Sequence, residues 1–484
     1  MLAIPGIVFI LIFIYARPQE FFERLQMIPL LYVFFALAVF GLILDVRLKN
    51  LRIRGTPLLP WVALLFAWSS LSLIVHRPPH ASRPFVELCI CVALYLLVAH
   101  GVQTFRGLRV VAGSVLAMVV FVCFVGAHQG LSPTGCLVLD PSTYGETSTG
   151  TPDGRPCDTV HACYTGDVEP GADYACEHLG LLGTTSVGGG RVRYRGVLQD
   201  PNELSLAGGI GLPLAFAIGD GRRRAAGKRA LSAVTFALVL LCAVMTGSRG
   251  GQLVFLAVLG AYGLKRLGLK GLAVGVLLAA PLLYFGGRTG DEASSSTLQR
   301  LDCWASALSI WGSHPIFGVG LGQFTEYNDM TAHNSYLLAL AELGLPGMLI
   351  FSMVFYVAAK TPLAVLREVE GGAAQGPQAG AQREFARHAQ PVGGPLAGGQ
   401  AARPWAMALL AAFAGLTVGI FFLSFTYHYV LWIFFGLSGA LYSSVRTHYP
   451  SFAVRLTLKD FVFVFLIDVT IIAFVYAYTR AVLG

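Results

Sequence analysis

Three arginines alternate along one segment that is suited to contact an anion. They recur in RVRYRGVLQDPNELS, residues 191–205, as Arg191, Arg193 and Arg195. Alternate residues of an extended segment lie on one side of the chain, and guanidinium groups match phosphate oxygens in a bidentate fashion. The following Asp200-Pro201-Asn202 is a turn and helix-start signal. The segment therefore predicts an anion site, and the alternative is a well-capped helix start with basic residues near lipid headgroups.

A fourth arginine lies in a tight connection between two apolar stretches. TGSRGG, residues 246–251, leaves almost no loop around Arg249. The arginine either snorkels to the membrane surface or provides a second contact to a phosphate.

An amphipathic stretch follows within LQRLDCWASALSIWGSHPIFGVGLGQF, residues 298–324, and carries Arg300, Asp302, Trp304 and Trp311. Tryptophans are typical of headgroup depth, so this stretch predicts an interfacial helix. The Gly-rich turn after His314-Pro315 lacks the glycine spacing and the βαβ context of a dinucleotide site.

A histidine precedes a further apolar stretch in AHNSYLLALAELGLPG, residues 332–347. His333 and Asn334 open this stretch, and Glu342 lies deeper in it. A lone interfacial histidine is usually inert, but a neutral imidazole is also the natural general base near pH 7.

Arginines that hold a phosphate, together with a histidine that accepts a proton, suit the transfer of a group from a lipid-linked pyrophosphate to an acceptor hydroxyl. No nucleotide site is evident, and the loops contain no DxD acidic pair that would require a metal. We therefore expect no cofactor and no metal.

Composition defines the elements that must position these residues. The chain has 484 residues, of which 55% are hydrophobic and 12% charged, and its mean hydropathy is +0.66. Soluble chains carry about 25% charged residues. The composition excludes a soluble enzyme, a disordered scaffold and a collagen-like fibre, and the net charge of +8 reflects membrane orientation instead of nucleic-acid binding.

Apolar blocks predict an all-α polytopic integral membrane protein with about 12–13 transmembrane helices and two large extracytoplasmic loops. We interpret residues 2–16 as a retained first span. The last span, 461–479, carries Asp468. The expected blocks are 2–16, 28–45, 57–75, 85–100, 110–127, 204–219, 231–246, 252–264, 271–287, 336–359, 405–426, 429–444 and 461–479.

Basic residues collect in connections that fall on one side, which the positive-inside rule assigns to the cytoplasm. They include Arg47 to Arg54, Arg222 to Arg229, Lys265 to Lys270, and Arg446 to Lys459. The predicted divisions are N-terminal spans (1–127), a first outer loop (128–202), spans (203–287), a second, catalytic outer loop (288–334), one span (335–359), a flexible cytoplasmic linker (360–404) and C-terminal spans (405–484).

Four cysteines share the first outer loop: Cys136, Cys157, Cys163 and Cys176. Cysteines in an exported polar segment favour two disulfides, for which three pairings exist. Zinc binding is the weaker alternative because no Cys-x-x-Cys is present, and free thiols are the third.

The ordered motifs RGVLQDPNELS, GSRGG, HPIFGVGLGQF and AHNSYLLALAELGLPG resemble the O-antigen ligase and O-antigen polymerase superfamily of bacterial envelopes. YARPQEFF, residues 15–22, also resembles members of that family, whose core would cover about residues 190–355. The four-cysteine stretch departs from the family pattern, as does the odd number of spans.

The resemblance implies a metal-independent, inverting glycosyltransferase of the inner membrane with its active site facing the periplasm. Its donor would be an undecaprenyl-pyrophosphate-linked glycan, and its acceptor a glycan, a lipid A core or a protein, with membrane lipid as a further partner and no nucleic acid. By motif, Arg195, Arg249 and Arg300 would hold the pyrophosphate and His333 would act as the base. Asp200, Asn202, Asn334 and Glu342 would support them.

Two other classes remain open. A transporter or flippase for a lipid-linked saccharide predicts internal repeats and charges at mid-membrane. A structural envelope protein, whose Cys-rich loop binds a partner, predicts that changing His333 is harmless.

Overall fold

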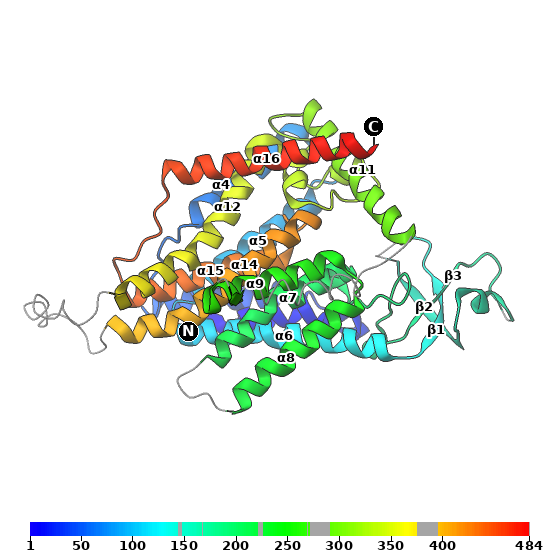
Figure 1. Cartoon of the computed structure of the whole chain (residues 1–484), viewed down its shortest axis with the longest axis horizontal. Coiled ribbons are helices and arrows are strands. Elements are labelled where there is room, and N and C mark those ends of the chain that lie inside the picture. The colour runs from blue at the N-terminus through cyan, green and yellow to red at the C-terminus, as the bar shows by residue number, and fades with distance from the viewer. Residues whose placement is uncertain are drawn as a thin grey trace, which may run out of the picture.

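The computed structural model describes residues 1–143, 148–166, 168–220, 226–268, 270–271, 291–374 and 395–483. Most of these residues are helical (Figure 1). The long helices are α1 (Ala3–Ala16), α3 (Leu30–Arg47), α4 (Leu59–His76), α5 (Ser82–Gly101), α6 (Phe105–Leu131), α7 (Pro201–Gly219), α8 (Ala226–Met245), α9 (Arg249–Leu267), α11 (Asp291–Ser313), α12 (Ser335–Ala374), α14 (Pro395–Phe422), α15 (Tyr429–His448) and α16 (Leu458–Leu483).

Within the described residues, eight helices are long and apolar enough to cross a membrane, and α1 is a shorter apolar helix. The predicted all-α polytopic class is therefore confirmed. Helices α7, α9 and α15 also coincide with predicted spans but are not among the eight. Almost every residue of α7 and α15 is buried inside the bundle, where neighbouring helices and not lipid surround it.

Two sequence predictions concern segments that the structure describes only in part. The predicted span 271–287 lies outside them apart from Gly271, as do Arg222, Arg223 and Arg224. The predicted linker 360–404 is helical at both ends, because α12 continues to Ala374 and α14 begins at Pro395. The stretch that follows Lys360 is rich in Ala, Leu, Glu and Arg, which are strong helix formers.

The core of the bundle lies where α14 packs against α7, α9 and α12 (Figure 1). Glycines allow the close approach of these helices. A Cβ on Gly251 of α9 would lie 1.9 Å from Ser205 Oγ of α7, and one on Gly419 of α14 would lie 1.9 Å from Leu206 Cδ1. Because Cβ atoms do not approach that closely, glycine at these positions brings the ends of α7, α9 and α14 together.

Helix α12 is broken at Gly344, which has φ 73° and ψ −176°. The break frees carbonyls that would otherwise bond within the helix. The Ala341 and Glu342 carbonyls accept the N–H groups of Val319 and Gly320 at 2.9 and 3.0 Å. A broken span is tolerated in a membrane when its backbone groups find such partners, so the Gly-rich turn 314–324 is an integral part of α12 packing.

Residues 128–202, the predicted first outer loop, contain a small sheet that projects from one end of the bundle (Figure 1). Strands β1 (Thr134–Leu139), β2 (Gly150–Pro156) and β3 (Tyr174–His178) pair antiparallel in the order β2-β1-β3. Disulfides join Cys136 to Cys163 and Cys157 to Cys176. Three of these sulfurs lie within 4.8 Å of one another, but disulfide sulfurs are not the thiolates that zinc requires.

The last helix, α16, lies on the outside of the bundle against α11 and α12 (Figure 1). Most of its apolar side chains are exposed, as expected for a lipid-facing helix. Its one deep acidic residue, Asp468, is buried and accepts a hydrogen bond from Ser352 Oγ of α12 at 2.7 Å. This bond explains how the acidic residue is accommodated in the predicted span 461–479.

Candidate active site

The N-terminal ends of two helices meet at the candidate site. Asp200 caps α7 by accepting the Asn202 N–H at 2.7 Å, and Ser248 caps α9 by accepting the Gly251 N–H at 3.0 Å. Ser248 Oγ also donates to Asn202 Oδ1 at 2.6 Å. The two capped ends are therefore fixed to each other by buried side chains.

Charges of both signs lie at these two ends: Asp200 and Glu203 are acidic at the start of α7, whereas Arg249 is basic at the start of α9. A helix N-terminus carries about half a positive charge and is a ready anion site. Arg249 is the first residue of α9, and its side chain is exposed. A cation at this end of a helix opposes the helix dipole and costs about 0.3–1 kcal/mol. That arrangement is expected where the position serves to bind an anion.

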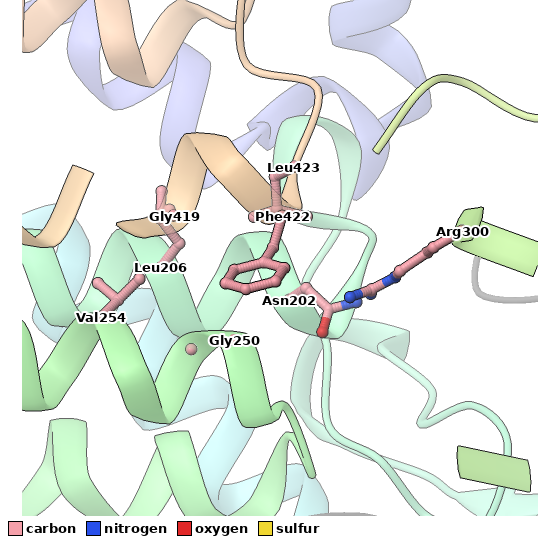
Figure 2. Close-up of a pocket in the computed structure, with 9 residues that line it drawn as sticks. Asn202, Leu206, Gly250, Val254, Arg300, Gly419, Phe422 and Leu423 are labelled. Carbon is pink, nitrogen blue, oxygen red and sulfur yellow. The ribbon is translucent and has the colours of Figure 1, made fainter. Parts of the chain in front are cut away.

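A narrow pocket lies between these ends and α14 (Figure 2). Its walls include Asn202, Gly250, Arg300, Phe422 and Leu423. Figure 2 shows the half-buried Arg300 extending from α11 towards Asn202, beside the Phe422 ring. The enclosed volume of about 10 Å³ is close to what one water molecule needs. The pocket itself therefore has no room for a ligand group larger than a water molecule.

His333 lies immediately before α12 in a strained backbone conformation. Its φ is 48°, in the left-handed region that non-glycine residues seldom adopt. Its neighbours Ala332 and Asn334 are fully buried, whereas His333 is half-buried. Strained residues of this kind cluster at functional sites, where the surrounding structure holds them in place.

Asn334 performs one structural task and retains one unused donor. Its Oδ1 accepts the N–H groups of Tyr336 and Leu337 at 3.0 and 3.1 Å and so caps α12. Its Nδ2 is buried with no hydrogen-bond partner among the residues that the structure describes. A buried amide donor without a partner is unusual in a folded protein.

One segment connects the pocket to His333. Ser335 Oγ donates to the Leu423 carbonyl at 2.7 Å and accepts the Phe425 N–H at 2.8 Å. Leu423 also lines the pocket with Arg300. The connection between α14 and α15 therefore places the start of α12 next to the ends of α7 and α9.

His428, in that same connection, was not singled out from the sequence. Its Nε2 donates to the Val197 carbonyl at 2.8 Å, and its Nδ1 accepts the Val430 N–H at 3.3 Å. Both ring nitrogens are used by the neutral imidazole, and burial lowers the pKa of His428 to about 4. His428 thereby fixes the segment before α7 to the start of α15.

The three alternating arginines do not all face one region. Arg193 and Arg195 line a separate polar pocket of about 150 Å³ with Glu20, whereas Arg191 Nε donates to the Thr246 carbonyl at 2.9 Å. Arg195 donates to the Leu182 and Gly183 carbonyls at 3.1 and 2.5 Å and packs over the Phe21 ring. Its guanidinium is therefore largely occupied in shaping the base of the outer loop.

Glu342 lies away from the surface and supports the Gly-rich turn. Its Oε1 accepts the Phe324 N–H at 3.2 Å, and its carbonyl accepts the Gly320 N–H at 3.0 Å. This predicted supporting residue therefore holds residues 320–324 against α12.

Comparison with known proteins identifies one region. Residues 234–352 match the family model of the O-antigen ligases, and no curated protein sequence matches the chain. The matched region contains Arg249, Arg300, His333, Asn334 and Glu342, while Arg195, Asp200 and Asn202 precede it. The predicted relationship to the O-antigen ligase superfamily is confirmed, and it supports a membrane protein that transfers glycans.

Proposed function

We propose that this chain, a member of the O-antigen ligase superfamily, is a metal-independent glycosyltransferase of the bacterial inner membrane. Its donor is a glycan linked to undecaprenyl pyrophosphate. Its acceptor is a hydroxyl of another glycan, a lipid A core or a protein, on the periplasmic side. The observation that carries the proposal is that the N-terminal ends of α7 and α9 meet beside Arg300. His333 lies immediately before α12, and the first residue of this helix, Ser335, bonds to Leu423 of the same pocket.

The orientation is supported by the two ends of α15. Its 20 residues, at about 1.5 Å each, span about 30 Å, the thickness of the hydrocarbon core. His428 at its start contacts Val197 near the site. Arg446 lies in its last turn, and Arg455 and Lys459 follow. Because basic residues collect on the cytoplasmic side, the site end faces the periplasm.

The pyrophosphate would bind at the mouth of the pocket. Arg300 supplies a guanidinium group from the wall of the pocket, and Arg249 supplies a second one from the start of α9, next to the lining residue Gly250. The N-terminus of α9 adds partial positive charge. Charge that develops on the leaving oxygen is thereby stabilised without a metal. We propose a smaller contribution to pyrophosphate binding for Arg195 than for these two arginines, because Arg195 already donates to backbone carbonyls.

His333 would accept the proton of the acceptor hydroxyl. The acceptor oxygen forms a bond to the anomeric carbon, and the bond between that carbon and the pyrophosphate oxygen breaks. The proton moves to the imidazole, and the electron pair leaves with undecaprenyl pyrophosphate. A direct attack of this kind inverts the anomeric centre. The strained backbone of His333 supports a catalytic role, because strained residues cluster at functional sites.

The test is the substitution His333→Ala in cells, with surface glycan read on a gel and protein level on a blot. Loss of a general base lowers the rate by about 10²–10⁴-fold, so we expect no glycan transfer at normal protein level. His161→Ala is the matched control, because His161 is an exposed histidine of the outer loop. Normal glycan in the His333→Ala strain would refute the assignment of the base.

A further inference from the structure

A cavity of about 500 Å³ lies far from the candidate active site, between α12, α14 and the start of α16. Its α12 wall includes Tyr356, Lys360 and Arg367. Lys360 lies 25 positions after Ser335, or about 38 Å along a helix that rises about 1.5 Å per residue. Since the hydrocarbon core is about 30 Å thick, the cavity lies at headgroup depth on the opposite membrane face.

The floor of the cavity is a closed polar cluster. Asp460 of α16 accepts hydrogen bonds from Lys360 Nζ and Tyr356 Oη of α12, each at 2.5 Å. It also accepts the Thr457 N–H at 2.6 Å. The charges of Asp460 and Lys360 therefore compensate each other, and the cluster fixes the start of α16 against α12.

Two further charges at the mouth of the cavity stay exposed. Arg367 and Glu368 both line it, and neither forms an ion pair with any side chain in the described part of the chain. The lining also includes apolar side chains, among them Leu363, Leu410 and Phe452. The cavity thus combines one available cation, one available carboxylate and an apolar wall, which suits neither a free anion nor a purely apolar ligand.

We propose that this cavity binds a zwitterionic phospholipid headgroup, with the lipid phosphate on Arg367 and the lipid ammonium group on Glu368. Guanidinium and phosphate are a matched pair, and a purely anionic headgroup would meet the carboxylate of Glu368. The acyl chains would follow the neighbouring face of α16, where Phe461, Val462 and Phe465 are exposed. A volume of about 500 Å³ is in the usual range of ligand sites.

The experiment is native mass spectrometry of the purified full-length protein with added phosphatidylethanolamine or phosphatidylglycerol. We expect phosphatidylethanolamine to remain bound in preference to phosphatidylglycerol. Arg367→Ala should weaken the binding of both lipids about fivefold, the effect of one basic residue near lipid phosphate. Glu368→Gln should abolish the preference between the two lipids.

The matched control is Arg455→Ala, because Arg455 is an exposed arginine of the connection before α16 that does not line the cavity. It should bind both lipids like the unaltered protein. The proposal is overturned if phosphatidylglycerol is retained as well as or better than phosphatidylethanolamine, or if Arg367→Ala and Glu368→Gln behave like Arg455→Ala. Displacement of the lipid by millimolar inorganic phosphate would overturn it as well, since a free-phosphate site needs no acyl chains.

Discussion

The side-chain oxygen and the side-chain nitrogen of Asn334 have different surroundings, so their roles can be tested by different substitutions. Its side-chain oxygen, Oδ1, caps α12, while its side-chain nitrogen, Nδ2, is buried without a partner among the described residues. A buried donor left unsatisfied costs about 1–3 kcal/mol. In the proposed reaction, that donor would bond an oxygen of the donor or acceptor glycan.

Asn334→Asp keeps the capping oxygen and removes the amide donor. Asp and Asn are equivalent helix caps, but a buried carboxylate costs free energy. We therefore expect Asn334→Asp to lower the unfolding midpoint less than Asn334→Ala does, while transfer falls at least about tenfold, the worth of one charged or buried hydrogen bond. Asn334→Ala should lose both transfer and stability. Equal transfer by Asn334→Asp and the unaltered protein would show that the amide donor plays no part.

His428 gives the protein a defined sensitivity to acid. Its pKa of about 4 lies below the ordinary value of 6.5, so the unfolded chain binds a proton more readily between these values. Its stabilising contribution is therefore complete above pH 6.5 and is lost as the pH falls towards 4. Glu203, 4.0 Å away, is the acidic neighbour that would moderate this loss.

The check is the apparent unfolding midpoint at about pH 7.5 and about pH 5, for the unaltered protein and His428→Gln. Glutamine does not titrate, so the drop between the two pH values should be smaller in the variant. An equal drop would mean that other groups cause the acid sensitivity.

Residue types alone point to part of the candidate site. Arg249, Asn202 and His333 stand out as polar groups at the edges of apolar blocks. Ser248, Ser335 and His428 do not, because serines and histidines next to a span are ordinary and only the folded chain reveals their partners. The roles of Arg191 and Arg193 were also hidden, since their backbone acceptors Thr246 and Thr185 depend on the packing of the loop.

At the scale of elements, the break in α12 and the turn 314–324 form one unit. The turn appears in the sequence as a Gly-rich motif, but its docking partners are 18 or more residues away. A Cβ at Gly344 would lie 2.1 Å from the Ile316 carbonyl oxygen. The glycine is required both by this contact and by its φ of 73°.

Gly344→Ala should therefore displace the turn from α12. The strained backbone alone costs about 1–3 kcal/mol, and the steric clash adds to it, so we expect a lower unfolding midpoint and reduced transfer. Gly312→Ala is the matched control, because Gly312 is a helical glycine with open space around its Cβ position. If both variants unfold alike, the turn does not depend on Gly344.

The outer loop shows where element prediction failed. Cysteine spacing indicated two disulfides but left three pairings, and the sheet itself was not predicted. Strand β2 has the sequence GTPDGRP, which lacks the alternating apolar pattern of a strand. Its pairing with β1, together with the pairing of β1 with β3, is the local structure that places Cys157 near Cys176.

At the scale of the whole molecule, composition was sufficient to predict the fold class but not the position of the candidate site. Long apolar blocks predict the helices because a bilayer demands them. The proposed anion site instead combines residues from α7, α9, α11 and the end of α14, which are far apart in the sequence. Such a juxtaposition depends on helix packing, for which glycines such as Gly251 and Gly419 are necessary but not recognisable in advance.

The most direct test of the central claim uses the purified protein in liposomes with a lipid-pyrophosphate-linked glycan, an acceptor and excess metal chelator, without any nucleotide. We predict that mass spectrometry detects the glycosylated acceptor and an equal amount of free undecaprenyl pyrophosphate, and that His333→Ala yields neither. Transfer that requires a metal would contradict the account. So would movement of the donor across the bilayer without any transfer.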